Sequence, residues 1–277
     1  MFHVEQQQTH IKTKDFLVSN EEFFITKTSD PGLLKTLPSP PKNKIYKYYK
    51  SDKYTSHHSQ NTSIFNFIYR LSRKLNFFFK KRHLNLKSCK NLLDFGSGDG
   101  FFIHNIFKSN IRVFGVEPVL RTSNTNVYKQ LSDVHKQGQQ FSTITAWHAL
   151  EHVHNINQTS QMLVDLLEQK GRLVVAVPNY ESYDAVFYKS FWAGYDTPRH
   201  LWHLNQKAVI NMFIKRGLTF RYSKPMLLDA FYVSYLSEIN KKSRLPILRA
   251  FLIAFFSNSK AVFTNQYSSN LFVFEKN

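Results

Sequence analysis

The sequence predicts an α/β protein: a doubly wound, mostly parallel seven-stranded sheet of the Rossmann-like kind, with an N-terminal extension and a helical insertion that forms a lid. Strand-like and helix-like segments alternate from Asn91 onward, which is typical of parallel βαβ units with right-handed crossovers. Three of the nine glycines fall within residues 96–100, directly after the first strand-like segment. The residues before Asn91 are polar and lack this alternation, so we expect them to lie outside the sheet.

Each element of the main domain follows from its local pattern. Short apolar runs rich in β-branched residues predict strands, and apolar residues three and four positions apart predict helices. The predicted strands are 91–95, 111–118, 126–128, 141–147, 171–179, 218–223 and 269–276, and the predicted helices are 101–108, 157–169 and 207–217. The strand at 126–128 is the weakest of these patterns, because only two of its residues are apolar or aromatic.

The residues before this domain form two further segments, so the chain divides into 1–60, 61–88 and 89–277. Four prolines between Pro31 and Pro41 oppose a long helix, and we expect residues 1–60 to be irregular and to take part in substrate recognition. The mixture of tyrosine and lysine at 44–54 suits stacking on a nucleic acid. Packing of these rings on a neighbouring domain is the favoured interpretation, so nucleic acid is not expected as a partner.

Residues 61–88 carry one apolar stripe at helical spacing, which predicts an amphipathic helix. The stripe consists of Ile64, Ile68, Leu71, Leu75 and Phe78, and basic residues lie mostly off it. Such a helix suits either contact with a membrane surface or the capping of a domain with its charged side in water. We favour the cap and keep peripheral membrane contact as the alternative.

The composition excludes a largely disordered chain and a collagen-like structure. With 42% hydrophobic and 16% aromatic residues among 277, the chain has the composition of a globular protein. Its net charge of +18 is concentrated before residue 91, where 17 basic residues accompany 6 acidic ones. This excess favours anionic partners such as phosphorylated substrates or a membrane surface.

The cellular compartment is also suggested by the sequence. Cys89 is the one cysteine, so a disulfide within the chain and a zinc ribbon of paired cysteines are both excluded. The N-terminal residues lack the pattern of a signal peptide. The apolar stretch from Pro246 to Phe256 contains Arg249 and is shorter than the ~20 residues that span a bilayer. We therefore expect a cytoplasmic protein.

The glycine-rich segment carries the chemistry. Asp94-Phe95-Gly96-Ser97-Gly98-Asp99-Gly100 follows a strand and opens a helix, the position of a nucleotide cradle in a doubly wound sheet. Glu117 ends the next strand, where an acid can accept hydrogen bonds from both hydroxyls of a ribose. In a dinucleotide-binding fold, the pyrophosphate of the cofactor would lie beside Asp94 and Asp99. These two carboxylates would repel it. The same carboxylates attract a ligand with a positive charge, which favours S-adenosylmethionine (SAM) over NAD.

Four segments in order resemble the motifs of class I SAM-dependent methyltransferases. They are LLDFGSGDGFF, VFGVEP, FSTITAWHALEHV and GRLVVAVPN, and the similarity extends over about residues 90–225. The chain is most similar to the bacterial group that includes ubiquinone-biosynthesis O-methyltransferases. YDTPRHLWHLN at 195–205 also resembles a segment of that group.

The resemblance implies a cofactor site at known positions. Residues 94–100 would surround the methionine and ribose parts of SAM, and Glu117 would bind the ribose hydroxyls. Pro118 and Val119 would lie beside the adenine. Trp147 and His148 would line the methionine end, where the indole can add a cation–π contact to the sulfonium. Core packing is the alternative role for Trp147.

Histidines supply the remaining candidates. His148, Glu151 and His152 share one face if their segment is helical, and this is a weak candidate set for a metal ion. The favoured interpretation has no metal: His148 lines the cofactor pocket, while Glu151 and His152 orient a loop. His200 is the candidate general base, because neutral imidazole accepts protons near pH 7. The alternative is that Asp196, Arg199 and His200 form a structural turn.

These observations predict a SAM-dependent methyltransferase. Its acceptor is expected to be an oxygen or nitrogen of a small molecule or of a lipid- or sugar-linked intermediate, and transfer to carbon or sulfur stays open. Two other classes of function remain: a non-catalytic SAM-binding subunit, and an NAD-dependent sugar-nucleotide enzyme. The last lacks a Tyr-x-x-x-Lys pair at Tyr128 or Tyr183. The sequence contains no indication of oligomeric state.

Overall fold

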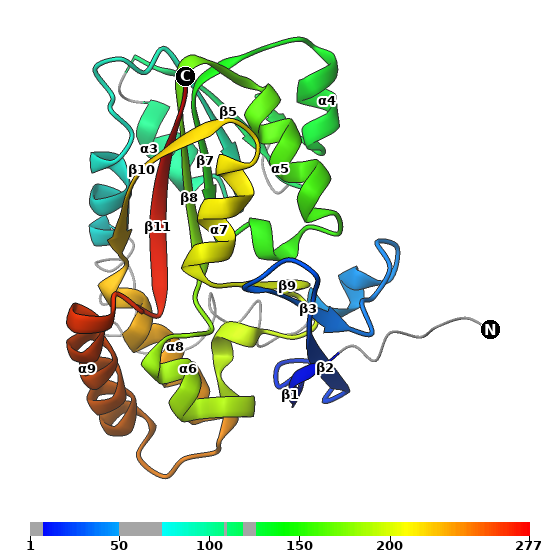
Figure 1. Ribbon diagram of the computed structural model, residues 1–277, viewed down its shortest axis with the longest axis vertical. Helices are drawn as coiled ribbons and strands as arrows, with labels where there is room; N and C mark the ends of the chain where they lie inside the picture. The colour runs from blue at the N-terminus through cyan, green and yellow to red at the C-terminus, as the bar shows by residue number, and fades with distance from the viewer. Residues whose placement is uncertain (1–7, 50–73, 108–109, 119–125) are drawn as a thin grey trace.

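Two β-sheets organise the molecule, which is described here from a computed structural model (Figure 1). The structure describes residues 8–49, 74–107, 110–118 and 126–277. The larger sheet has seven strands in the order β10-β11-β8-β7-β4-β5-β6. Its strands are β4 (Asn91–Phe95), β5 (Arg112–Val116), β6 (Val127–Tyr128), β7 (Phe141–Trp147), β8 (Leu167–Pro178), β10 (Leu218–Pro225) and β11 (Ser269–Lys276). The predicted mostly parallel seven-stranded sheet is therefore confirmed.

The large sheet is parallel from β8 to β6 and antiparallel where β10 and β11 join it. Alternate residues of each central strand face opposite sides, as the pleat requires. Leu93, Val175 and Phe274 belong to the core on one side, which is covered by α4 (Leu131–Lys136), α5 (Ile156–Asp165) and α7 (Gln206–Ile214). Leu92 and Val174 belong to the core on the other side, which is covered by α3 (Phe101–Phe107) and helical residues 74–82. The result is a three-layer α/β/α arrangement.

The N-terminal segment differs from the irregular structure that we expected. It forms β1 (Thr9–Lys14), β2 (Glu22–Lys27) and β3 (Leu33–Leu37), which pair with β9 (Trp202–Leu204) in an antiparallel sheet of order β1-β2-β3-β9. Leu33 pairs with Leu204, so residues far apart in the sequence share this sheet. The expectation of irregular structure was wrong because the prolines lie mostly at the end of β3 and beyond it, where they do not interrupt a strand.

Tyrosines 48 and 49 follow the smaller sheet in a 3₁₀ helix, Ile45–Tyr49. Tyr48 is buried, its hydroxyl donates to Glu21, and its ring packs on Phe23. These contacts of Tyr48 lie within the N-terminal segment itself. The expected packing on the neighbouring domain is made by Tyr49, whose ring lies 6.4 Å from that of His152 and whose hydroxyl lies 3.2 Å from Nδ1 of His152. Within the predicted cap, residues 74–82 are helical, whereas Ile64, Ile68 and Leu71 lie outside the described residues.

Helices also fill the space beside the end of the large sheet. They are α6 (Tyr183–Tyr188), α8 (Leu227–Asn240) and α9 (Pro246–Thr264), and in Figure 1 they lie at the lower left, opposite the smaller sheet. A third core joins Ile25 and Leu34 of the smaller sheet to Tyr188 and Trp192 near α6. The apolar stretch that we ended at Phe256 is part of α9, which continues to Thr264.

Candidate functional site

The glycine-rich turn joins β4 to α3 and is open on one side. Gly96, Gly98 and Gly100 all have positive φ, at 77°, 56° and 76°. A Cβ atom at Gly96 would lie 2.6 Å from Cβ of Ala149, so this position has no room for a side chain. Among the residues that the structure describes, no heavy atom would lie within 4 Å of a Cβ at Gly98 or Gly100. The backbone at these two glycines is therefore accessible to a ligand.

Glu117 is held against this turn. The backbone N–H groups of Gly96 and Ser97 donate to the carbonyl of Val116, at 2.9 and 3.1 Å. The N–H of Gly98 donates to Oε2 of Glu117, at 2.9 Å. The predicted glycine turn and strand-end acid are thus brought together. Pro118 follows as an exposed residue, and Val119 lies outside the described residues.

Asp94 is a buried acid beneath the turn. Its side chain is 1% exposed and accepts a hydrogen bond from Oγ1 of Thr145 at 2.6 Å. Burial raises the pKa of Asp94 to about 7, although the Thr145 bond and the charge of Lys80 act in the opposite direction. A positively charged ligand nearby would favour its ionised form. Phe95 packs against the core of the large sheet, and Ser97 is buried within the turn. Asp99 accepts a hydrogen bond from the N–H of Phe101 at the start of α3.

Trp147 ends β7 and belongs to the core between the large sheet and α3, which is the core-packing alternative for this residue. It is 7% exposed, and its ring meets the ring of Phe102 edge to face at 5.5 Å. Nζ of Lys80 lies 4.7 Å from the indole centroid, so the ring face already accepts a cation. An open turn, a strand-end acid, a buried carboxyl and this indole together fit a nucleoside that carries a positive charge.

His148 is a charged residue beside the cradle. Its Nε2 lies 3.1 Å from Oδ2 of Asp229, and its Nδ1 lies 3.5 Å from Oε1 of Glu151. Burial lowers the pKa of His148, but the two carboxylates outweigh burial and raise it to about 9. Near pH 7 this ring is therefore a cation, which binds anions and cannot accept a proton.

Glu151, His152 and His200 form a second cluster. One ligand atom of each lies within 4.8 Å of those of the other two. Glu151 is 1% exposed, and neither carboxylate oxygen has a hydrogen-bond partner among the residues that the structure describes. Burial acts to raise the pKa of Glu151, but the neighbouring histidines lower it on balance. The buried carboxylate is thus stabilised by imidazoles on more than one side.

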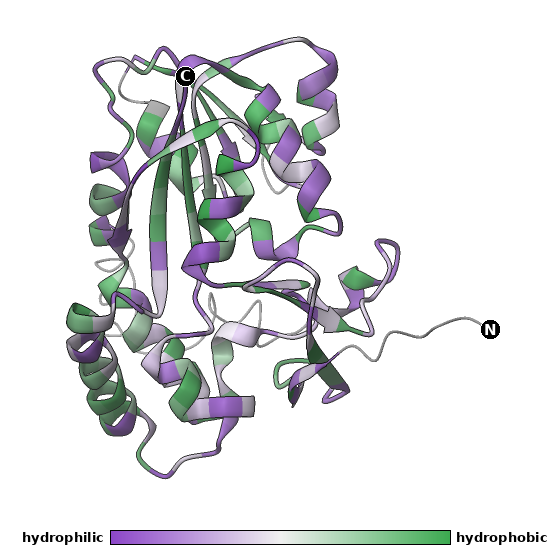
Figure 2. Ribbon diagram, in the orientation of Figure 1, coloured by the Kyte–Doolittle hydropathy of each residue, from purple (hydrophilic) through white to green (hydrophobic). Residues whose placement is uncertain are grey.

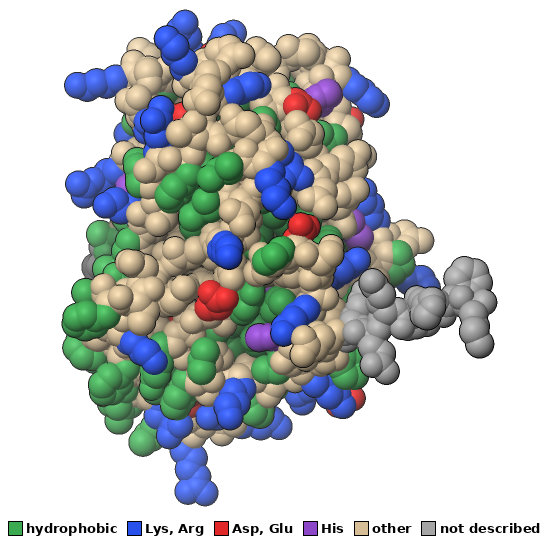
Figure 3. All heavy atoms as spheres, in the orientation of Figure 1, with side chains coloured by type: hydrophobic (Ala, Val, Ile, Leu, Met, Phe, Trp, Pro, Cys, Tyr) green, Lys and Arg blue, Asp and Glu red, His purple; other side chains and the backbone are tan. Residues whose placement is uncertain are grey.

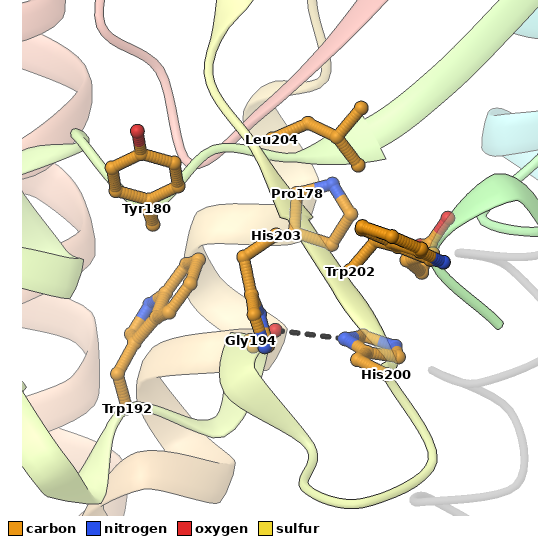
Figure 4. A pocket seen from close by; sticks show the side chains of 9 residues that line it. Pro178, Tyr180, Trp192, Gly194, His200, Trp202, His203 and Leu204 are labelled. Atoms are coloured by element: carbon orange, nitrogen blue, oxygen red, sulfur yellow. Dashed lines mark hydrogen bonds between the residues drawn. The ribbon is translucent and has the colours of Figure 1, made fainter. Parts of the chain in front are cut away.

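The two imidazoles of this cluster are held by backbone carbonyls. Nδ1 of His152 lies 3.0 Å from the carbonyl of Arg199, and Nδ1 of His200 lies 2.9 Å from that of Gly194 (Figure 4). Burial and the neighbouring His200 lower the pKa of His152 to about 4, so it is neutral. Of the predicted weak metal set, Glu151 and His152 lie together with His200, whereas His148 pairs with Asp229. The expectation that this cluster binds no metal stays a prediction, with the metal site as its weak alternative.

His200 also lines a small cavity behind this cluster. The cavity is bounded by Glu151, Pro178, Tyr180, Trp192, Gly194, His200, Trp202, His203 and Leu204 (Figure 4). Its volume of about 10 Å³ has room for roughly one water molecule. His200 is 9% exposed, so an acceptor can reach its ring only if the surrounding segment moves.

Arg199 fixes the segment that carries His200. Its guanidinium is buried and lies 2.7 Å from Asp196, 3.0 Å from Asp15 and 2.9 Å from the carbonyl of Tyr48. The predicted structural turn is therefore present at Asp196 and Arg199. The additional partner, Asp15, comes from the loop after β1.

Sequence reasoning missed three of these residues. Lys80 belongs to the predicted cap helix, but no local pattern distinguishes it from the lysines beside it. Asp229 lies in the first turn of α8, in a stretch without any recognised motif. Asp15 could have been suspected from the sequence, because Asp favours turns. In the structure its carboxylate accepts hydrogen bonds from the N–H groups of Leu17 and Ser19.

Comparisons with known proteins agree with this geometry. The sequence profile of a family described as "Methyltransferase domain" matches residues 63–222. A SAM-dependent methyltransferase from Archaeoglobus fulgidus is similar in structure, with a TM-score of 0.50, 17% identity, and coverage of 78% of this chain and 100% of that one. A mycolic acid cyclopropane synthase, solved with SAH and CTAB, has a TM-score of 0.51, 12% identity, and coverage of 75% and 85%. No curated protein matches the sequence.

Proposed function

The chain belongs to this methyltransferase-domain family, and from that premise we propose that it is a SAM-dependent methyltransferase that acts on an oxygen or nitrogen acceptor. The acceptor is a small molecule or a lipid- or sugar-linked intermediate, and the enzyme is most similar to the ubiquinone-type O-methyltransferases. The observation that carries the proposal is the bond from Gly98 to Glu117 beside an open glycine turn. This bond supports a ribose-binding role for Glu117, because it holds the carboxylate beside backbone that a nucleoside can approach.

When bound, SAM supplies a methyl group on a positively charged sulfur. Loss of the methyl group leaves a neutral thioether, so the leaving group needs no acid to protonate it. The residues of the chain bind the cofactor and orient it and the acceptor. Glu117 accepts hydrogen bonds from hydroxyls, buried Asp94 stabilises positive charge, and Trp147 lines the methionine end. Alignment of the acceptor and exclusion of water are the remaining contributions to the rate.

The histidines have separate roles in this proposal. His148 is a cation near pH 7, because Asp229 and Glu151 raise the pKa of this side chain to about 9, and its charge is balanced by these two carboxylates. His200 is the candidate base: its Nδ1 is held by a carbonyl, so a proton on Nδ1 leaves Nε2 as acceptor. The base becomes accessible when the 194–204 segment moves.

Calorimetry tests the cofactor part of the proposal. The wild-type protein is expected to bind both SAM and its demethylated product. Gly98→Arg places a long cationic side chain in the open turn and should abolish both binding heats. Gly138→Arg is the matched control, because Gly138 also has positive φ (64°) and open space at Cβ but lies outside the site. Normal SAM binding by Gly98→Arg would refute the assigned cradle.

Mass spectrometry tests the activity itself. Cell extracts incubated with labelled SAM and the protein should contain a labelled product that is absent with Gly98→Arg. Binding of SAM without any transfer would favour a non-catalytic SAM-binding subunit. Labelling confined to small neutral phenols, with no dependence on salt, would contradict the lipid- or sugar-linked acceptor.

A further inference from the structure

The outer face of α8 and α9 is unusually apolar for a surface. On α9, every third or fourth residue faces inward and is small: Ala250, Ala254, Ser257 and Ala261. The large apolar side chains face outward. We define the α8–α9 face as Leu227, Leu228, Tyr232, Ile239, Leu245, Ile247, Leu248, Phe251, Leu252, Phe255, Phe256, Val262 and Phe263, which are between 42% and 88% exposed. Figure 2 shows that α9, at the lower left, consists largely of hydrophobic residues, and Figure 3 shows apolar side chains gathered at the surface there.

Small residues on both helices make this arrangement stable without the outer side chains. The buried residues of α8 are Ala230, Ser234, Ser237 and Glu238, and α8 packs along α9. Oγ of Ser257 also donates to Oδ1 of Asp184 at 2.7 Å, which fixes α9 to α6. Close contact through small residues, with large apolar residues outside, is the pattern of helices that pack within lipid.

The charges around the face have one sign. Exposed cations within or directly after α8 and α9 in the sequence are Lys241, Lys242, Arg244 and Lys260, and Arg249 is exposed but paired. Neither acid of α8 is exposed on the face. Asp229 pairs with His148, and Glu238 is fully buried and pairs with Arg249 at 3.0 Å. The face therefore combines apolar side chains with cations and has no exposed carboxylate on α8 or α9.

We propose that the α8–α9 face docks on a lipid bilayer that contains anionic lipids, with α9 lying along the membrane surface. Anionic headgroups complement the cations, and the phenylalanines enter the acyl boundary. A second copy of the chain would bring the same cations against each other, so self-association is disfavoured.

The arrangement of α9 favours lying on the membrane over crossing it. Among the described residues, α9 is the helix long and apolar enough to span a bilayer, with 19 residues and a mean hydropathy of 1.3. However, its inner face is fixed to α6 and α8, and it carries Arg249 and Lys260. These contacts hold one side of the helix against the protein while the other side is free to meet lipid.

Vesicle co-sedimentation tests the proposal. The full-length protein is mixed with phosphatidylcholine vesicles with and without phosphatidylglycerol. It should sediment with the anionic vesicles, and less protein should sediment at high salt. The double change Phe251→Glu and Phe255→Glu should lower the bound fraction at least about tenfold, because it removes apolar contact and adds repulsion from the lipid. Ile214→Glu is the matched control, since Ile214 is 49% exposed on α7, away from the face.

Two further measurements keep the result decisive. Thermal unfolding and SAM binding of the double variant should match the wild type, because Phe251 and Phe255 are exposed and outside the cofactor site. Wild-type protein that stays in the supernatant with anionic vesicles would overturn the proposal. The proposal would also be overturned if the wild-type protein binds no vesicles and light scattering shows that it forms a dimer, while the double variant is a monomer.

Discussion

Arg199 shows how one buried charge organises two distant segments. Its guanidinium, 1% exposed, meets Asp15 near the N-terminus and Asp196 three residues before it. These carboxylates raise the pKa of Arg199 further above its usual range, despite the opposite effect of burial. Asp15 is fully buried, so the loss of its cation would leave a charge without compensation.

We therefore expect Arg199→Met to lower the free energy of unfolding by about 3–5 kcal/mol. Chemical denaturation monitored by circular dichroism measures the change. Arg112→Met is the control: Arg112 is exposed on β5, and the same substitution there should cost less than about 0.5 kcal/mol. An equal small effect for both variants would show that the Asp15–Arg199–Asp196 bridge contributes little to stability.

His148 makes stability depend on pH at alkaline values. Its pKa is raised to about 9 in the folded chain by Asp229 and Glu151, above the ordinary value of 6.5. The folded state therefore binds the proton more tightly, and this stabilisation is complete below about pH 6.5 and lost as pH rises through about 9. His148→Asn keeps a residue tolerant of positive φ but cannot be protonated.

The difference in unfolding free energy between wild type and His148→Asn should thus shrink from pH 6.5 to pH 9.5. Denaturant titrations at several pH values measure it. A difference that stays constant over this range would mean that His148 is not charged in the native protein.

The helix α9 has opposite requirements on its two sides. Ala254 is fully buried against its neighbours, whereas Phe255, the next residue, is 56% exposed. Ala254→Leu should therefore lower stability by about 1–3 kcal/mol, because the larger side chain forces the helices apart. Phe255→Ala should change it by less than about 0.5 kcal/mol. Thermal and chemical unfolding compare the two, and the reverse order would contradict the orientation of α9.

Elements with a clear local pattern were predicted well from the sequence. The strands at Asn91–Phe95 and Phe141–Trp147 and the glycine turn between β4 and α3 are as expected, because each depends on adjacent residues. The N-terminal strands were missed because the four prolines were expected to keep the segment irregular, although β1-β2 and β2-β3 pair locally. Only the pairing of β3 with β9 is non-local, and no feature of residues 33–37 indicates that partner. The true length of α9 was missed because polar residues after Phe256 end the apolar run but continue the helix.

The candidate site divides in the same way. Asp94, Gly98 and Glu117 were predicted because their roles follow from positions at strand ends. Lys80 and Asp229 were not, since both approach Trp147 or His148 from helices outside the sheet, through tertiary packing. The cluster of Glu151, His152 and His200 was only partly predicted, because His200 arrives from a segment about fifty residues away along the chain.

At the scale of the whole molecule, cores on both sides of the large sheet are joined to a third one. Ile25 and Leu34 from the smaller sheet pack with Tyr188 and Trp192, and the side chain of Val233 on α8 borders the same cluster. Tyr195 also belongs to this core and Ile253 borders it, so the His200 segment packs with the smaller sheet, α8 and α9. Movement of the 194–204 segment would be transmitted to both the N-terminal strands and α8.

The pairing of β3 with β9 has a consequence for any attempt to shorten this chain. The family match begins at residue 63, which invites removal of everything before it. Such a truncated polypeptide would lose three of the four strands in the smaller sheet, leave the backbone of Trp202–Leu204 without its neighbour, and strip Arg199 of Asp15 and the Tyr48 carbonyl. The N-terminal residues are therefore needed to hold β9 and Arg199, and with them the segment that carries His200.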